Sequence, residues 1–161
     1  MHEIPTYQCH VGSAGWDHAD WVGSFYPEDL PAEWRLSYYN TSFTCTWLSY
    51  EAWSGQDAAT LAQWVEDTLE RFRFVLQLRP GGQAAEDAQK LALLAPRTGL
   101  LVDESREYPQ LLWLEQNPDL KRLAQRLREI DRSAFPAYII SREHDLPAMT
   151  QARTLLEVMG F

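Results

Sequence analysis

The sequence has few cysteines, no long apolar run and little positive charge, and each shortage excludes a class of protein. Two cysteines in 161 residues cannot form the dense disulfide framework that holds many small secreted domains together. No stretch approaches the roughly 20 apolar residues that a membrane-spanning helix needs. With 14 Lys+Arg against 23 Asp+Glu, the formal charge is −9. We therefore expect no binding to nucleic acids, whose phosphates require a basic surface.

The start of the chain and its cysteines favour a cytoplasmic protein. Residues 1–5 lack the basic and then apolar layout of a secretory signal peptide. Cys9 and Cys45 fall within predicted strands, where free cysteines are commonly buried. The sequence has no paired C-x-x-C or H-x-x-x-H spacing, and His10 and His18 do not make a metal site by themselves. We therefore predict no metal site and no cofactor.

The chain otherwise has an ordinary globular composition, with 45% hydrophobic residues, and its length suits a single domain over residues 1–161. The period of hydrophobicity switches between two residues and about 3.6 residues. Apolar segments typical of strands cover residues 8–12, 43–50, 72–78, 99–103 and 137–140. Helical patterns cover residues 31–38, 57–69, 84–94, 117–130 and 145–159, and residues 109–116 fit either a helix or a loop. Strands that alternate with helices predict an α/β fold with a parallel sheet.

Ligands of parallel α/β sheets bind at the carboxyl ends of the strands, so the residues that follow each strand are candidate site residues. Here these positions combine aromatic rings with a few polar and charged groups, which suits a planar ligand, a sugar or the side chains of a partner. The candidate ligand-binding residues from this argument are Ser13, Trp16, Trp21, Tyr26, Ser49, Arg79 and Arg142.

Three ionisable residues are candidates for catalysis. Asp103 and Glu104 follow the fourth predicted strand, and His144 follows the fifth. If these strands are neighbours, the three side chains can act as acid–base partners or as a metal cluster; the alternative is that they are surface charges that flank strand ends. A catalytic triad of Ser13, Asp17 and His18 is disfavoured, because three residues of one short loop seldom align in that way.

Several segments carry a family resemblance. Residues 11–16 read V-G-S-A-G-W and residues 21–30 read W-V-G-S-F-Y-P-E-D-L, followed by L-S-Y-Y at 36–39 and F-R-F at 72–74. This combination resembles the opening of the YecE-like family (domain of unknown function 72), and residues 138–152 resemble its last strand and helix more weakly. The resemblance implies a TIM-type barrel and brings no established activity. It identifies the chain as a shortened and divergent member.

The departures from the family pattern fall at the strand ends. Trp47 and Ser49 stand where the resemblance implies a glutamate and an asparagine, and Gln77 stands where it implies a lysine. Ser141 and Arg142 lie near its paired asparagines. The missing carboxylate and amine are groups that transfer protons or hold an oxyanion, and an indole and an amide cannot replace them. Trp47 and Gln77 therefore join the candidate ligand-binding residues.

The length indicates an incomplete barrel. A (β/α)₈ barrel typically needs about 250 residues, so five predicted strands in 161 residues indicate an abbreviated barrel that is open on one side. Open edges need a cover, and we expect self-association into a homo-oligomer. We expect a non-catalytic module that binds a small molecule or takes part in assembly. The alternative is an enzyme of hydrolase or lyase type that acts on a small polar substrate through Asp103, Glu104, Arg142 and His144.

Overall fold

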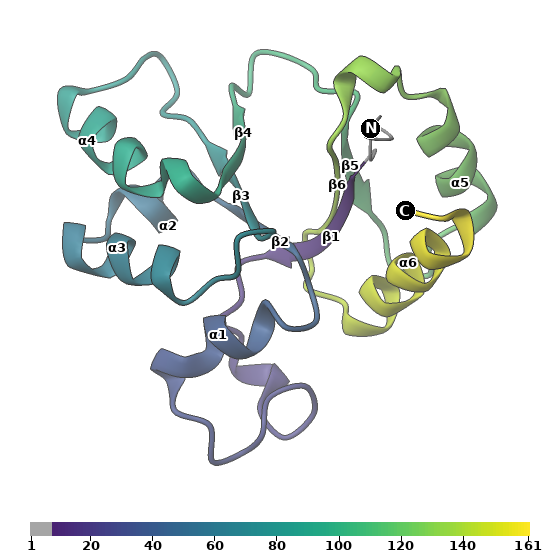
Figure 1. Cartoon of the computed structure of the whole chain (residues 1–161), viewed down its shortest axis with the longest axis horizontal. Helices are drawn as coiled ribbons and strands as arrows, with labels where there is room; N and C mark the ends of the chain where they lie inside the picture. The colour runs from purple at the N-terminus through teal and green to yellow at the C-terminus, as the bar shows by residue number, and fades with distance from the viewer. Residues whose placement is uncertain (1–7) are drawn as a thin grey trace, which may run out of the picture.

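The computed structural model describes residues 8–161, and a six-stranded sheet forms its centre (Figure 1). The strands are β1 (Cys9–Ala14), β2 (Cys45–Leu48), β3 (Arg73–Gln77), β4 (Thr98–Val102), β5 (Leu111–Leu114) and β6 (Ala137–Ser141). Their order in the sheet is β4-β3-β2-β1-β6-β5, and every neighbouring pair is parallel. The sheet curves into half of a TIM-type barrel, so the predicted fold class is confirmed.

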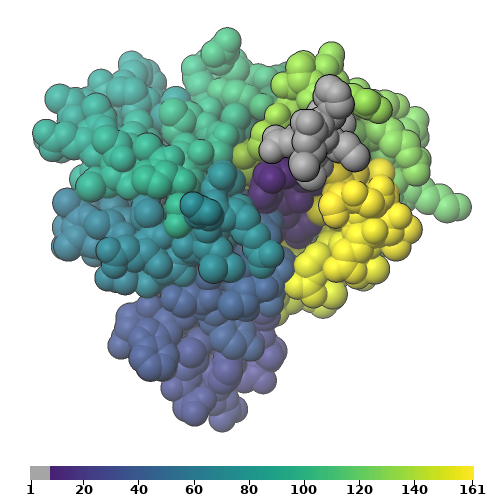
Figure 2. Space-filling model, in the orientation of Figure 1, coloured from purple at the N-terminus to yellow at the C-terminus, as the bar shows by residue number. Residues whose placement is uncertain are grey.

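The helices lie in two groups beside the sheet. They are α1 (Arg35–Tyr39), α2 (Tyr50–Ser54), α3 (Ala58–Glu66), α4 (Ala85–Leu94), α5 (Leu120–Glu129) and α6 (Leu146–Met159). In Figure 1, α2, α3 and α4 gather to the left, toward the β3 and β4 end of the sheet, and α5 and α6 gather to the right, toward the β5 and β6 end. The segment between β1 and β2, which contains α1, forms a lobe at the lower end of the molecule (Figure 2). Within residues 8–161, no helix combines the length and the apolar character needed to cross a membrane.

The caps of α3 and α6 lie where the sequence predicts, whereas α5 is capped at Asp119, two residues after the expected start at 117. The carboxylates of Asp57, Asp119 and Asp145 each accept a hydrogen bond from a backbone N–H in the first turn of α3, α5 or α6, at 2.8–3.1 Å. Such a cap contributes about 1 kcal/mol to stability. Gly160 ends α6 with a φ of +88°, a left-handed conformation that glycine adopts without steric cost.

Each face of the sheet buries its own apolar core, because successive strand residues point to opposite faces. On one face Leu48, Phe74 and Ile139 pack with residues of the surrounding helices. On the other, concave face the cluster consists of strand residues together with Tyr108. Its buried members are Cys45, Val75, Val102, Tyr138 and Ile140, and its partly buried members are Trp47, Leu100, Tyr108, Leu111 and Trp113.

The concave side is closed by side chains that reach across it. A Cβ atom placed on Gly99 of β4 would lie 2.2 Å from the hydroxyl oxygen of Tyr138, which belongs to β6. In the sheet order, β4 and β6 are separated by three strands. The Tyr138 ring therefore spans the inside of the half-barrel, and the absence of a side chain at Gly99 leaves room for its hydroxyl.

Two elements differ from the sequence-based prediction. β5 occupies residues 111–114, where a helix or a loop was expected, and it raises the number of strands from five to six. Its side chains do not alternate in polarity because Leu112 and Leu114 belong to the core beside the helices and Leu111 and Trp113 to the concave core. α2 begins inside the segment predicted as one strand over 43–50, because the side chain of Ser49 accepts a hydrogen bond from the backbone N–H of Ala52.

Both cysteines are free thiols, in agreement with their assignment to strands rather than to a disulfide. Cys45 is fully buried in the concave core, whereas Cys9 is half-buried. Burial raises the pKa of the Cys9 thiol to about 12. The Cys9 thiol therefore stays protonated near neutral pH and is a poor nucleophile.

Candidate functional site

The loop that follows β1 is held in one shape by hydrogen bonds. The backbone N–H of Gly15 donates to the carbonyl of Trp47 at 2.9 Å, and Gly15 has a φ of +75°, a conformation that favours glycine. The Ser13 hydroxyl donates to the Gly15 carbonyl, and the Tyr26 hydroxyl donates to the Trp16 carbonyl, both at 2.5 Å. These bonds fix Trp16 just beyond the carboxyl end of β1.

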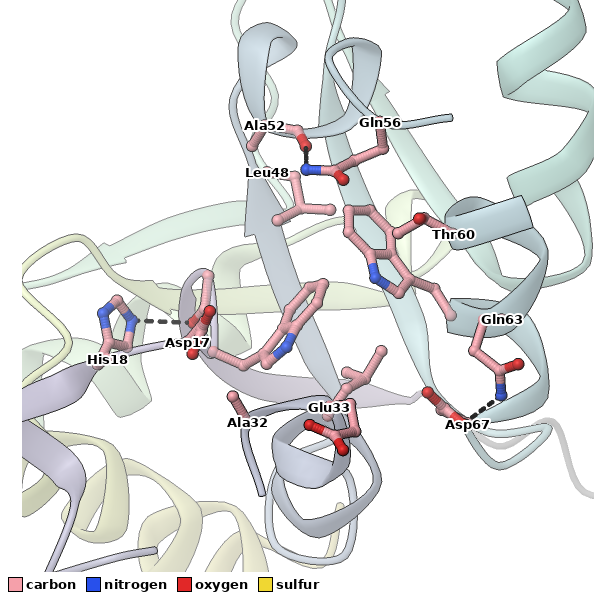
Figure 3. A pocket seen from close by; sticks show the side chains of 14 residues that line it. Asp17, His18, Ala32, Glu33, Leu48, Ala52, Gln56, Thr60, Gln63 and Asp67 are labelled. Atoms are coloured by element: carbon pink, nitrogen blue, oxygen red, sulfur yellow. Dashed lines mark hydrogen bonds between the residues drawn. The ribbon is translucent and has the colours of Figure 1, made fainter. Parts of the chain in front are cut away.

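A groove of about 570 Å³ opens beside this loop (Figure 3). Its volume falls within the range of small-molecule sites, about 300–1,000 Å³. The 14 residues that line it all lie between positions 15 and 67 and come from the loop after β1, the start of the α1 region, the end of β2, and α2 and α3. Leu36, Leu48 and Ala52 supply apolar surface, and the indoles of Trp16 and Trp64 meet edge to face with their centroids 4.9 Å apart.

The polar lining of the groove is acidic. Asp17, Glu33 and Asp67 line it, and no lysine or arginine is among its lining residues. Asp17 forms an ion pair with Arg35 and Asp67 accepts a hydrogen bond from Gln63 at 2.8 Å, whereas Glu33 is exposed and no ion pair involving it is found within residues 8–161. Figure 3 shows Glu33 and Asp67 toward one side of the groove, with Gln56 and Thr60 toward the other. The groove thus suits a neutral or cationic ligand better than an anion.

Of the residues predicted after the first strand, Trp16, which is 9% exposed, lines the groove, and the other three are packed around it. Ser13 and Tyr26 hold the loop through the hydrogen bonds described above. Trp21 is 2% exposed, and its indole N–H donates to the carbonyl of His144 at 3.1 Å. Ser49 caps α2. These four side chains build the site rather than face a ligand.

The concave mouth of the half-barrel is filled by aromatic rings. Trp47 of β2 and Trp113 of β5 meet edge to face with their centroids 5.6 Å apart. The guanidinium carbon of Arg142 lies 3.7 Å from the centroid of Trp113, within the range of a strong cation–π contact. Trp47 and Arg142 therefore come close to the same ring, and that ring takes up the position where barrel proteins usually hold a ligand.

Gln77 connects two segments at the same end of the sheet. Its side-chain oxygen Oε1 accepts a hydrogen bond from the backbone N–H of Tyr50 at 2.9 Å, and its side-chain nitrogen Nε2 donates a hydrogen bond to the carboxylate of Glu104 at 2.8 Å. Both halves of the amide are thereby used within the protein. An amide fits this position because it must both accept from a backbone N–H and donate to a carboxylate, which a lysine cannot do.

The three catalytic candidates do not come together. β4 pairs with β3, whereas β6 pairs with β1 and β5, so the strands before Asp103 and His144 are not neighbours. Asp103 and Glu104 line a hollow near the ends of β3 and β4 with Arg79, and His144 lines a different hollow with Asp20. The Asp103 carboxylate accepts hydrogen bonds from the backbone N–H and hydroxyl of Ser105, which lower its pKa.

Sequence reasoning did not find a cluster of His18, Asp20 and His144. One potential ligand atom from each of these residues lies within 4.8 Å of the other two. The two imidazole rings stack with their centroids 3.9 Å apart, and His144 Nε2 lies 3.2 Å from a carboxylate oxygen of Asp20. His18 and His144 are 126 positions apart, so no local spacing could indicate the pair; the weighed pair, His10 and His18, is not part of one cluster.

A comparison with known families agrees with the family resemblance over residues 10–81. Residues 10–81 match the family described as "Protein of unknown function DUF72", and this segment contains the whole lining of the groove. A crystal structure of a DUF72 family protein from Thermotoga maritima is similar with a TM-score of 0.46 and 17% sequence identity. The match covers 96% of this chain and 63% of that one, so this chain spans less than two thirds of its length. No curated protein matches.

Proposed function

We propose that this chain, whose residues 10–81 are a DUF72 segment, is a non-catalytic module that binds a small molecule in the groove beside Trp16. The expected ligand carries an apolar ring or face and an amine. The observation that carries the proposal is the composition of the groove, where two indoles and several aliphatic side chains lie beside three carboxylates, with no lysine or arginine in the lining.

The electrostatics of the groove favour a cation. An ammonium group about 4 Å from a carboxylate gains roughly 1 kcal/mol in water and several times more at the lower effective dielectric of a protein surface. Asp17 already has Arg35 as its partner, which leaves Glu33 and Asp67 as the carboxylates to receive an amine. The indole faces of Trp16 and Trp64 add cation–π attraction and apolar contact.

The filled concave mouth supports a binding role over catalysis. At that end of the sheet the Trp113 ring packs against both Trp47 and Arg142. The side-chain oxygen and nitrogen of Gln77 are both hydrogen-bonded to protein groups. General acid–base catalysis needs an ionisable group within hydrogen-bond reach of the substrate. Asp103 and Glu104 line one hollow and His144 lines another, and no contact joins Asp103 or Glu104 to His144 in the described residues.

Three probes that share one ring and differ in charge test this proposal. Phenethylamine, 2-phenylethanol and phenylacetate are titrated into the ¹⁵N-labelled chain, and the indole N–H signals of Trp16 and Trp64 are followed by NMR. We expect phenethylamine to bind at least tenfold more tightly than phenylacetate, with 2-phenylethanol between them, because a difference of about 1.4 kcal/mol corresponds to a factor of ten.

Matched variants place the charge preference in the groove. Glu33→Gln removes an exposed lining carboxylate and is expected to narrow the difference between phenethylamine and phenylacetate. Glu86→Gln removes an exposed carboxylate of α4 that does not line the groove, and we expect no change. Equal binding of the three probes, or signal changes that avoid Trp16 and Trp64, would refute the proposal.

A further inference from the structure

The cluster of His18, Asp20 and His144 lies where the loop after β1 meets the loop after β6. His18 and Asp20 come from the first of these loops and His144 from the second, so the fold joins two distant parts of the chain at this point. Asp20 is exposed and both histidines are partly exposed, and Asp20 and His144 line a hollow of about 310 Å³. An ion from solvent can therefore reach the three side chains.

The separations fit a small metal ion. Two ligand atoms that bind zinc at about 2.0–2.1 Å with tetrahedral geometry lie about 3.3 Å apart. His144 Nε2 and the Asp20 carboxylate oxygen are already 3.2 Å apart, and the whole triad of ligand atoms spans at most 4.8 Å. The third ligand atom reaches the same distance when the stacked rings of His18 and His144 turn out of their parallel arrangement, which their partial exposure allows.

His18 also has the outer contact that metal-binding histidines usually show. Its Nε2 lies 3.1 Å from the backbone carbonyl of Gly15. A ring nitrogen that faces a carbonyl carries the proton, which leaves Nδ1 with a free lone pair for a metal.

We propose that His18, Asp20 and His144 form a binding site for a divalent transition-metal ion such as Zn²⁺, with two nitrogen ligands, one oxygen ligand and at least one position open to water. Two imidazoles and a carboxylate suit zinc and neighbouring first-row metals rather than Mg²⁺ or Ca²⁺, which prefer oxygen ligands. On binding, the rings leave their parallel stack, because the lone pairs of two stacked imidazoles do not converge on one point. His18 also lines the groove, whereas Asp20 and His144 do not, so a change at Asp20 or His144 separates the metal site from the groove.

Isothermal titration of ZnCl₂ into the full chain at pH 7.5 tests the site. We expect one ion to bind per chain, and MgCl₂ to give no heat of binding at the same concentrations. Asp20→Ala, His18→Ala and His144→Ala are each expected to weaken zinc binding at least tenfold. Asp20 is the safest of the three positions because its side chain is exposed, so its loss leaves the folded core intact. Circular dichroism of every variant checks that it is folded.

Two further variants separate this site from other zinc ligands in the chain. Glu143→Gln removes an exposed carboxylate next to His144, and His2→Ala removes a histidine outside the described residues; we expect both to bind zinc like the parent chain. Zinc binding that persists in a folded His18→Ala/His144→Ala double variant, or the absence of any zinc binding by the parent chain, would overturn the proposal. Phenethylamine binding by the Asp20→Ala variant reports on the groove alone, so failure of one site is distinguishable from failure of the other.

Discussion

The concave mouth of the half-barrel and the groove beside Trp16 use the same kinds of side chain to opposite effect. At the mouth, the rings of Trp47 and Trp113 meet edge to face and the guanidinium of Arg142 lies over the Trp113 ring, so these side chains contact one another. In the groove, Trp16 and Trp64 also touch each other, yet about 570 Å³ stays open beside them. Aromatic residues at strand ends therefore do not indicate a binding site until their own packing partners are known.

The difference follows from what lies behind each set of rings. The concave core has no helix layer, so side chains from opposite strands must fill the half-barrel, as Tyr138 does when it reaches Gly99. The groove lies between α3, which is capped by Asp57, and the loop after β1, which is held in place by its own hydrogen bonds. One region is filled because it must stabilise the sheet, and the other can stay open because the surrounding elements stabilise it.

The largest expected effect tests whether the concave core carries stability. Tyr138 is 1% exposed and packs on His10 with the ring centroids 5.3 Å apart. Tyr138→Ala should lower the free energy of unfolding by about 3–5 kcal/mol, as is usual for a buried aromatic residue. Its hydroxyl has no hydrogen-bond partner within residues 8–161, so Tyr138→Phe should leave stability unchanged or slightly higher. Urea denaturation of both variants checks this, and a costly Tyr138→Phe would show that the hydroxyl has a role in the core.

A second prediction uses pH to probe the same core. Burial, and to a lesser extent the charge of Arg73, lower the pKa of His10 from 6.5 to about 4. The unfolded chain therefore binds more protons than the folded chain between these values, and stability should fall as the pH drops from about 6.5 to 4. The loss from this residue is at most about 3 kcal/mol. Urea denaturation as a function of pH measures the effect, and in His10→Gln the slope should become flatter; an unchanged slope would assign it to other groups.

The sequence predicts the order of the elements well, because each depends on local patterns. The predicted helix starts at Asp57 and Asp145 coincide with observed caps, the start predicted at 117 falls two residues before the observed cap Asp119, and the five predicted strands overlap observed ones. β5 escapes this reasoning because both of its faces are buried, which removes the alternation that marks a strand. α2 escapes it because a helix of one turn and a half gives too short a pattern to separate from the strand before it.

The candidate sites were harder to predict, because they depend on which strands become neighbours. Asp103 and His144 follow consecutive predicted strands, but these strands, β4 and β6, are not neighbours in the sheet. An additional strand, β5, lies between them in the sequence, and β6 pairs with β1. The pairing of β6 with β1 also places His144 beside His18 and Asp20, and no spacing in the sequence could predict this cluster. Trp16 was predicted because it lies directly after a strand, whereas Trp64 lies within the helix predicted over 57–69, and only the fold shows that it lines the groove.

A third prediction asks whether the groove can be closed without loss of stability. Thr60 lies on α3 in the lining of the groove, and Thr60→Phe should fill part of the open volume. We expect the free energy of unfolding to change by no more than about 0.5–1 kcal/mol, because the position is partly exposed. Phenethylamine binding should weaken at least tenfold. Ala59→Phe adds the same ring at an exposed position of α3 outside the lining and should leave binding unchanged, so equal losses in both variants would argue against the groove as the site.

The smallest expected effect concerns the edges of the sheet, where the concave core ends. β4 and β5 are the outer strands of the sheet in the described residues, and Leu101 of β4 is 40% exposed. An edge strand offers unpaired backbone groups to another strand. We therefore propose that two copies of the chain associate through the β4 edge of the sheet. Light scattering at micromolar concentration should then give a mass above that of the monomer.

Leu101→Lys introduces a charge at that edge and should weaken the association about tenfold, since a lysine on an edge strand disfavours pairing. Val158 of α6 is 80% exposed and does not belong to the sheet, so Val158→Lys adds the same charge elsewhere and should leave the association unchanged. A strict monomer for the parent chain would mean that the rings inside the half-barrel stabilise it without a second copy. The packed interior of the half-barrel would then be sufficient for a stable fold while both edge strands remain unpaired.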